Sequence, residues 1–323
     1  MILAGDIGGT NARLALFERA GARLRTIVSR KYPSSRHSSL EEIVARFLSE
    51  VEASVARACF AVAGPVSDGR VVATNLAWIV DAGRLAKAVR LDSVDLINDL
   101  EAVAHGLGEL EDSDLAVLHP GRPGSEGNRA IIAAGTGLGQ AGAYWDGSRH
   151  HPFACEGGHG DFGPRTAAEG ELLVYLLAKH DRVSYERVVS GSGLHEIYRF
   201  LRDSGGGQEP PWLTRELAED PPPVVISRAA IEGRSDLCRE ALNRFVSIYG
   251  AEAGNLALKM MARGGIWIGG GIAPKILPRL GGSTFVEAFL AKGRMQPLLE
   301  TIPVRLILNE GVGLLGAARY AGA

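Results

Sequence analysis

Residues 5–17, GDIGGTNARLALF, constrain the fold more than any other stretch of the chain. The apolar runs MILA and LALF flank three glycines, Asp6, Thr10 and Asn11, a pattern typical of a β-hairpin with a Gly-rich turn. Residues 130–145, AIIAAGTGLGQAGAYW, repeat the same plan of apolar run, Gly/Thr turn and apolar run. Two such hairpins, one at the start of the chain and one nearer its middle, predict a duplicated architecture that closes on one phosphate chain from two sides.

The composition of the two turns indicates how they would meet a phosphate. Glycine lets the backbone come close to a ligand, so that a row of N–H groups can face an anion. Asp6 only accepts hydrogen bonds at neutral pH, so we expect Mg²⁺ between it and a phosphate, bound directly or through water. Arg13 lies near the first turn but is better interpreted as structural. The alternative is a hairpin that is merely rich in glycine.

Two other phosphate motifs are excluded. Residues 137–142 fit GxGxxG, but the sequence AYWDG that follows predicts a strand and a turn, whereas a dinucleotide-binding fold needs a helix there. The chain contains no GxxxxGK[ST], so it is not a P-loop protein.

Charge and cysteine content narrow the partners and the compartment. The chain has 323 residues, enough for two domains, with 35 basic and 37 acidic residues and a net charge of −2. The chain therefore has no overall positive charge that would attract it to nucleic acid or to an anionic membrane. Cys59, Cys155 and Cys238 lie far apart without a CxxC pair, which predicts reduced thiols. The N-terminus lacks a secretory signal, and the uncharged residues 130–145 are too few to span a bilayer. We expect a soluble, cytoplasmic protein without nucleic-acid or membrane partners.

Strands and helices alternate through the first hundred residues. The periodicity predicts helices over 39–49, 81–89 and 101–107 and strands over 58–63 and 94–97, the pattern of an α/β sheet. Ligands of such sheets collect at the carboxyl ends of the strands. Asn98 and Asp99 follow a strand directly and are therefore candidate ligand contacts, although a simple helix N-cap explains them equally.

The rest of the chain adds more elements of both kinds. We predict a loop over 110–129, an exposed loop over 203–223, strands beginning at 264 and 304, and helices over 166–180, 184–189, 226–261 (in two pieces) and 311–320. The last of these helices is rich in small residues and can pack closely.

Three further segments carry candidate binding residues. Residues 156–163, EGGHGDFG, contain Glu156 and His159 on a tight turn, where a histidine can also be purely structural. Glu186 follows Arg182 by four residues, so a surface ion pair would account for it. The glycines at 269–271 form a turn that could lie flat against adenine or could simply connect a strand to a helix.

Taken together, these motifs resemble the bacterial ATP-dependent glucokinases. The resemblance rests on GDIGGTNARLAL, IND at 97–99, GTGLG at 135–139, EGGH at 156–159, ERVVSGSGL at 186–194 and GGGIAPK at 269–275, in this order over nearly the whole chain. It is to the long-chain form of the sugar kinase, Hsc70 and actin superfamily. The zinc-binding cysteine cluster of the related repressor/kinase group is missing, so we expect no zinc.

The resemblance implies a two-domain, actin-like ATPase (ribonuclease H-like) fold with a ligand cleft between an α/β domain of residues 1–100 plus 309–323 and another of residues 101–308. It implies a homodimer that uses MgATP to phosphorylate the 6-hydroxyl of glucose, with Asp99 as the catalytic base. The hexose site would comprise Asn98, Asp99, Glu156, His159 and Glu186. The nucleotide and its phosphates would be held by Gly5, Asp6, Ile7, Gly8, Gly9, Thr10, Gly135, Thr136, Gly137, Leu138, Gly270, Gly271 and Ile272.

The chemistry of these residues suits a hexose. Each sugar hydroxyl both donates and accepts hydrogen bonds, so a selective site needs carboxylates, an amide and an imidazole directed inward. Three alternatives remain at this point: a kinase for another hexose such as mannose or an N-acyl hexosamine, a non-catalytic sugar sensor of the same fold, and an actin-like filament protein.

Overall fold

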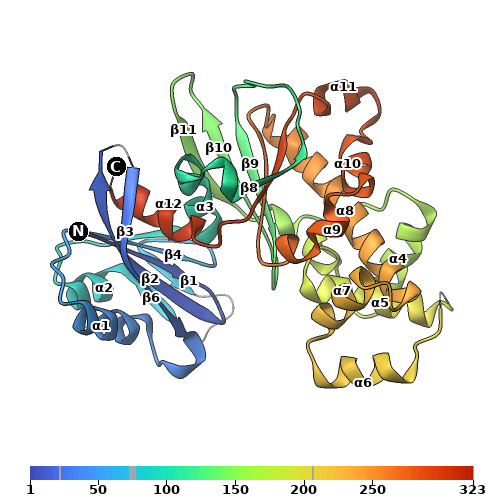
Figure 1. The fold of residues 1–323 in the computed structure, drawn as a ribbon, viewed down its shortest axis with the longest axis horizontal. Coiled ribbons are helices and arrows are strands. Elements are labelled where there is room, and N and C mark those ends of the chain that lie inside the picture. Colours follow the sequence, from blue (N-terminus) through green and yellow to red (C-terminus); the bar gives the residue numbers. More distant parts are fainter. Residues whose placement is uncertain (22, 73–77, 206, 323) are drawn as a thin grey trace. The chain divides into compact units, whose positions relative to one another are not determined.

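The computed structural model describes the chain except for residues 22, 73–77, 206 and 323. The chain folds into two compact units (Figure 1). The first consists of Met1–Asp114, Pro152–Ala154 and Asn309–Ala323, and the second of Leu115–His151 and Cys155–Leu308. Within the described residues, no helix is both long enough and apolar enough to cross a membrane.

The first unit is built on a five-stranded mixed sheet in the order β3-β2-β1-β4-β7. Its strands are β1 (Ile2–Ile7), β2 (Asn11–Ala20), β3 (Arg23–Pro33), β4 (Arg57–Val62) and β7 (Asp95–Asn98). Strands β1, β2 and β3 form an antiparallel meander, and β1, β4 and β7 run parallel. The predicted N-terminal hairpin is thus confirmed. Between β4 and β7 in the sequence, β5 (Arg70–Val72) and β6 (Ile79–Asp81) form a separate two-stranded sheet.

Helices cover both faces of this sheet, because alternate residues of each strand point to opposite sides. One apolar core packs strand residues such as Leu3 and Phe60 against α1 (Leu40–Val51) and α2 (Ala82–Val89). The other packs Ala4 and Ala61 against α3 (Asp99–Gly106) and α12 (Val312–Ala321). Figure 1 shows α1 and α2 on one side of this sheet and α12 on the other. Short 3₁₀ turns, η1 (Ser34–Arg36), η2 (Leu107–Glu109) and η3 (Asp112–Asp114), complete this unit.

Glycines bring α3 and α12 into direct backbone contact. A Cβ on Gly316 would lie 1.6 Å from the carbonyl oxygen of Ala102, and one on Gly106 would lie 2.3 Å from that of Val312. Both distances are far below any real contact, so these positions accept only glycine. The predicted close packing of the C-terminal small-residue helix is confirmed.

The second unit contains a six-stranded sheet in the order β11-β10-β9-β12-β13-β8. Its strands are β8 (Leu115–His119), β9 (Arg129–Ala134), β10 (Leu138–Trp145), β11 (His150–Cys155), β12 (Gly265–Gly269) and β13 (Val304–Ile307). Strands β9 and β10 form the second predicted hairpin, and β9, β12 and β13 run parallel. The predicted loop over 110–129 is wrong in part, because β8 pairs antiparallel with β13.

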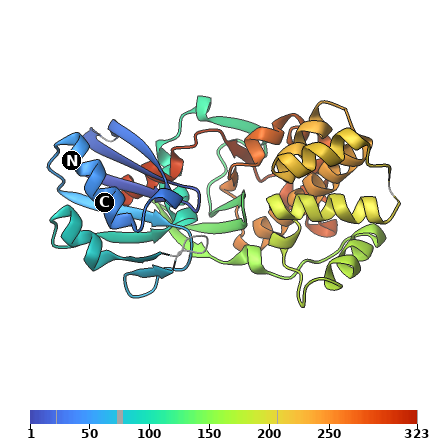
Figure 2. The same cartoon turned by 90° about the horizontal axis from the view of Figure 1, so that it is seen from below.

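A layer of helices packs on this sheet (Figure 2). Helix α8 (Asp236–Met260) contacts α5 (Gly191–Asp203), α7 (Pro222–Ile231) and α10 (Ser283–Leu290). The remaining helices are α4 (Ala167–Leu177), α6 (Pro211–Glu219), α9 (Leu277–Leu280) and α11 (Gln296–Leu299), with 3₁₀ turns η4 (Gly157–His159), η5 (Tyr185–Arg187), η6 (Ala273–Ile276) and η7 (Gly293–Met295).

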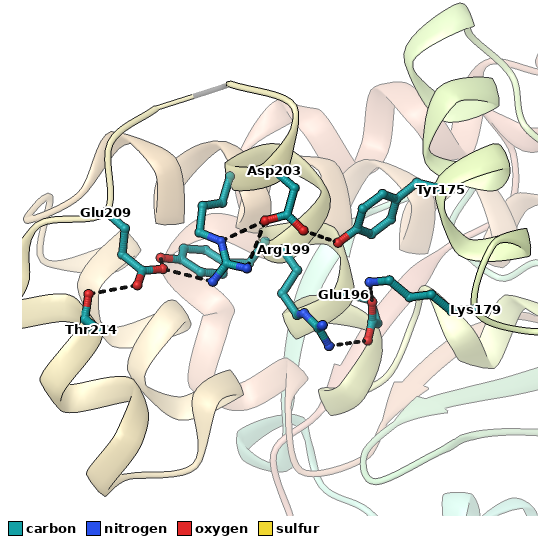
Figure 3. Close-up of polar contacts among 9 residues, drawn as sticks. Tyr175, Lys179, Glu196, Arg199, Asp203, Glu209 and Thr214 are labelled. Carbon is teal, nitrogen blue, oxygen red and sulfur yellow. Dashed lines mark hydrogen bonds and ion pairs between the residues drawn. The ribbon is translucent and has the colours of Figure 1, made fainter.

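The predicted exposed loop over 203–223 is also wrong in part, because α6 forms within it. Glu209 fixes this segment: its carboxylate accepts hydrogen bonds from the hydroxyls of Thr214 on α6, at 2.8 Å, and of Tyr198 on α5, at 2.6 Å (Figure 3). Asp203 similarly accepts a bond from the Tyr175 hydroxyl of α4 at 2.5 Å. Side-chain contacts thus fold a segment whose prolines suggested a loop.

Candidate active site

The turn of the first hairpin is fastened by a residue that the sequence analysis did not single out. Ser34, which is buried, donates its N–H to the Thr10 carbonyl and its hydroxyl to the Gly8 carbonyl, both at 3.0 Å. The Gly8 N–H donates across the turn to the Asn11 carbonyl at 3.0 Å. The turn carbonyls are therefore held from one side, which fixes the backbone conformation of residues 8–10. A serine following a strand and a proline gave no signal of this role.

The flanking residues of this turn serve the sheet. Gly5 lies inside β1, where a Cβ would be 2.4 Å from Cδ1 of Phe60, so the position requires glycine for packing. Ile7 is buried in the core. Of the residues expected at the phosphates, Gly8, Gly9 and Thr10 are those that form the turn itself.

Asp6 is held beside the N-terminal end of α12. Its carboxylate lies 3.3 Å from the position that a Cβ on Gly313 would take. Burial raises the pKa of Asp6, and the charge of Arg13 opposes that shift. Arg13 itself donates to the carbonyl oxygen of Glu310 at 2.8 Å and to its carboxylate at 2.5 Å. These contacts are consistent with the structural interpretation of Arg13.

Asn98 and Asp99 mark the junction of β7 and α3. Asn98 is the N-cap: its Oδ1 accepts the N–H groups of Leu100 at 2.9 Å and of Glu101 at 3.3 Å. Its Nδ2 donates to the Gly64 carbonyl at 3.2 Å. Asp99 is the first residue of α3. Since β1 and β7 both run parallel to β4, this junction and the Gly8–Gly9–Thr10 turn lie at the same edge of the sheet.

In the second unit, Glu186 contacts the turn of the second hairpin. Its Oε2 accepts the Leu138 N–H at 3.0 Å. A Cβ on Gly137 would lie 2.4 Å from the same oxygen, so the carboxylate occupies the space that a side chain would need. The expected ion pair with Arg182 is wrong, because Arg182 binds the Asp161 carboxylate at 2.5 Å and the His159 carbonyl.

The turn is also bonded to its neighbours through the main chain. Gly135 donates to the Gly137 carbonyl at 2.8 Å, and Gly191, at the start of α5, donates to the Gly135 carbonyl at 2.9 Å. Thr136 is exposed at the tip. The backbone of residues 135–137 is therefore fixed by both η5 and α5.

Residues 156–159 pack tightly on β10. A Cβ on Gly158 would lie 1.9 Å from the Leu138 carbonyl, and one on Gly157 would lie 2.0 Å from Oε1 of Gln140. This packing leaves the flanking side chains of Glu156 and His159 about half exposed, at 57% and 54%, with 3.9 Å between Oε2 and Nε2. The two side chains thus converge on one side of a rigid loop.

A buried polar network supports this loop from below. Gln140 donates to Oε1 of Glu252 at 2.9 Å, and Glu252 is fully buried in α8. Asn255 donates to Oε2 of Glu252 and to the hydroxyl of Tyr185, both at 3.0 Å, and Tyr185 precedes Glu186. The network therefore connects the supports of Glu156, His159 and Glu186. In the sequence its only signal is Glu252, an acid surrounded by small and apolar residues in the second half of α8.

The glycine turn at residues 269–271 packs against the end of β9. Gly270 has φ +84°, a conformation that favours glycine, and a Cβ there would lie 2.3 Å from the Ala134 carbonyl. The Ile272 N–H donates to the same carbonyl at 3.3 Å. A Cβ on Gly271 would meet nothing within 4 Å. Residues 270–272 thus form a tight strand-to-helix turn next to Gly135, with one open glycine.

The described residues contain no group of three or more His, Cys, Asp or Glu side chains able to hold a metal ion. A magnesium ion carried in with a nucleotide needs fewer protein ligands, since it is commonly bound by one or two carboxylates plus phosphate oxygens. Asp6, next to the Gly8–Thr10 turn, fits that requirement.

A sequence model of the glucokinase family matches residues 3–323. The chain belongs to the glucokinase family. A glucokinase from Nostoc punctiforme is 46% identical over 336 residues, covering 99% of this chain and 98% of that protein. The crystal structure of a glucokinase from an Antarctic psychrotroph is 33% identical, with a TM-score of 0.85 over 99% of this chain and 98% of that one.

The fold extends to more distant members of the superfamily. The structure of a ROK family glucokinase from Streptomyces griseus, solved with glucose and AMPPNP, has 21% identity and a TM-score of 0.67, covering 99% of both chains. The chain therefore has the actin-like ATPase fold, as predicted, and it is a sugar kinase that phosphorylates glucose. The alternatives of a sugar sensor and of a filament protein are set aside.

Proposed function

We propose that the chain transfers the γ-phosphate of ATP to the 6-hydroxyl of D-glucose. The observation that carries this proposal is the position of Asp99, at the same sheet edge as the rigid Gly8–Gly9–Thr10 turn. A carboxylate thereby lies at the same end of the sheet as a set of backbone N–H groups suited to phosphate, two strands away. The Streptomyces griseus glucokinase binds AMPPNP, which supports ATP as the phosphoryl donor.

Asp99 would act as the general base. It accepts the proton of the 6-hydroxyl as the sugar oxygen bonds to the γ-phosphorus and the bond to the β,γ-bridging oxygen breaks, releasing ADP. Asn98, Glu156, His159 and Glu186 would hold the remaining hydroxyls and orient the 6-oxygen. A site that bonds each hydroxyl rejects analogues lacking one by as much as about 10⁴–10⁵-fold, because its polar groups are left unpaired.

The glycine turns would stabilise the transferring phosphate. The N–H groups of Gly8, Gly135 and Leu138 already donate within the protein, so the backbone donors toward the phosphates would be those of Gly9, Thr10, Thr136 and Gly137. Residues 270–272 would face the adenosine, with Gly271 leaving room for the ring. Asp6 would hold Mg²⁺ through water, and the ion supplies charge neutralisation at the phosphate oxygens. We propose no zinc, because the described residues offer no ligand cluster for it.

Replacing Asp99 by Asn tests the role of the base. We expect turnover to fall by about 10²–10⁴-fold, the usual contribution of a positioned base, while glucose still binds by calorimetry. Asp92→Asn, an exposed aspartate just before β7, is the matched control and should keep wild-type activity. Undiminished turnover in Asp99→Asn would refute the assignment. A coupled assay across glucose, mannose and N-acyl hexosamines measures which hexose is preferred.

We also propose a cytoplasmic homodimer. Support comes from the family membership and from the three cysteines, all of which are free thiols. Sedimentation equilibrium at several protein concentrations tests the dimer, and a monomer mass throughout would exclude it.

A further inference from the structure

A cavity of about 500 Å³ lies in the first unit at the end of β3, between η1 and the helix α1. Its lining includes four cations, Arg30, Lys31, Arg36 and Arg46, together with Tyr32 and Glu50. None of these residues belongs to the proposed active site. Cavities that bind small molecules typically measure about 300–1,000 Å³, so this one has the size for a metabolite.

The positive charge of this basic cavity is only partly compensated. Arg46 pairs with Glu50, with 3.0 Å between Nε and Oε1, and the Tyr32 hydroxyl donates to the other Glu50 oxygen at 3.0 Å. In the part of the chain that the structure describes, no carboxylate lies within 4 Å of the charged groups of Arg30, Lys31 or Arg36, and all three are exposed. Cations gathered around one cavity repel one another, and an anion bound there would relieve that repulsion.

The lining of the basic cavity continues into the backbone that holds the first phosphate turn. Pro33, part of the lining, pairs in register with Asn11 at the end of that turn. The next residue, Ser34, binds the carbonyls of Gly8 and Thr10. A shift of residues 33–36 on ligand binding would therefore be transmitted to the turn through two hydrogen bonds.

We propose that the basic cavity binds a small phosphorylated anion and that its occupancy changes the affinity of the kinase for ATP. Phosphate oxygens match guanidinium and ammonium donors, and Tyr32 and Pro33 provide an apolar wall for the body of the ligand. The shared chemistry is a phosphate group. Its source is either an inorganic phosphate compound or a sugar phosphate, which the experiment separates. The effect on ATP rests on the function proposed above, whereas the binding does not.

Isothermal titration calorimetry on the full-length protein tests the binding. The active site is first filled with glucose and AMPPNP, and inorganic pyrophosphate or glucose 6-phosphate is then titrated at constant ionic strength. Wild type should bind at least one probe, and Lys31→Ala/Arg36→Ala should weaken it by at least about tenfold, because two charge-assisted bonds are lost. The matched control, Arg84→Ala/Lys87→Ala, removes two exposed cations from α2 and should change the dissociation constant by less than about twofold.

The pattern of binding identifies the ligand source. Binding of pyrophosphate alone indicates an inorganic ligand, and binding of glucose 6-phosphate indicates a sugar phosphate; both support the site. The proposal is overturned if neither probe binds at concentrations up to about 10 mM, since a dissociation constant above that range is too weak for a specific site. An equal loss in the control pair also overturns it, because the effect would then be general electrostatics. Thermal melts confirm that all variants are folded.

Ser34→Ala tests the connection to the turn. This variant should still bind the probe in the basic cavity, but the probe should no longer change the KM for ATP. If the probe alters that KM equally in wild type and in Ser34→Ala, transmission through Ser34 is wrong. If the Asp99 assignment fails instead, the calorimetric result is unaffected, so the two proposals fail separately.

Discussion

Replacing Gly137 by alanine should create a steric clash between the turn of the second hairpin and the carboxylate of Glu186. The new Cβ would lie 2.4 Å from Oε2 of Glu186, and ordinary contact begins at 3.4 Å, so the carboxylate must retreat by about 1 Å. That movement stretches its 3.0 Å bond to the Leu138 N–H to about 4 Å, which is beyond hydrogen-bonding range. Gly137→Ala should therefore break the contact between Glu186 and the turn.

The expected energy has two opposing parts. A hydrogen bond to a charged group is worth about 1.5–3 kcal/mol, and the lower end applies because Glu186 is partly exposed. Gly137 does not have a positive φ, so alanine fits its backbone and gains about 0.4–1 kcal/mol by restricting the unfolded chain. The free energy of unfolding should thus fall by about 1 kcal/mol in Gly137→Ala.

A double-mutant cycle isolates the contact. In a Glu186→Ala background the clash is gone, so the same Gly137→Ala change should stabilise the protein by about 0.4–1 kcal/mol in urea unfolding followed by circular dichroism. Gly135→Ala, where a Cβ meets nothing within 4 Å, is the control and should also stabilise. The KM for glucose should rise in Gly137→Ala. An identical cost of this substitution with and without Glu186 would refute the reasoning.

Three further predictions concern other parts of the molecule. Burial lowers the pKa of Lys292 to about 8 from its usual 10.5, so between these values the folded protein binds fewer protons than the unfolded chain. The stability of wild type relative to Lys292→Met should therefore rise from pH 8 to 10.5, by less than the full shift would give because solvent screens this partly exposed side chain. A pH-independent difference in urea unfolding would contradict this. Cys155 is partly exposed whereas Cys59 and Cys238 are buried, so native alkylation should label Cys155, slowly at neutral pH because burial raises its pKa, and glucose should protect it; mass spectrometry checks both effects. ATP hydrolysis without sugar should be much slower than phosphoryl transfer to glucose, and equal rates would exclude closure over the sugar as a gate.

The two hairpins were predictable because their signal is local. Apolar runs on either side of glycine turns give the same structure in almost any context, and both hairpins form as expected. Strand β3 and strand β8 gave no such signal. The side chains of β3 are mostly exposed, and its sequence does not alternate regularly between apolar and polar residues. Strand β8 gains its conformation from pairing with β13, almost two hundred residues away. Helix α6 begins at Pro211, a residue that indicates a loop in sequence but suits the first turn of a helix.

For the candidate site, residue identity was easier to predict than residue contacts. The sequence pointed to Asn98 as either a ligand contact or an N-cap, and only the structure supplies the cap. The spacing of Arg182 and Glu186 suggested a helical ion pair, but Arg182 precedes and Glu186 lies within a short 3₁₀ turn, where side chains four apart do not meet. Ser34 acts on residues 8–10 across the sheet, and no local pattern encodes such a contact.

The place of α12 in the first unit has a consequence for biosynthesis. The apolar face formed by residues such as Ala4, Phe17 and Ala61 is covered in part by Leu314 and Ala317, which are translated only after residues 115–308. At about 5–20 residues per second, the ribosome needs roughly 10–40 s to make the intervening residues 115–308. During that interval the nascent N-terminal sheet exposes an apolar surface. We therefore expect chaperones that act on ribosome-bound chains to bind it.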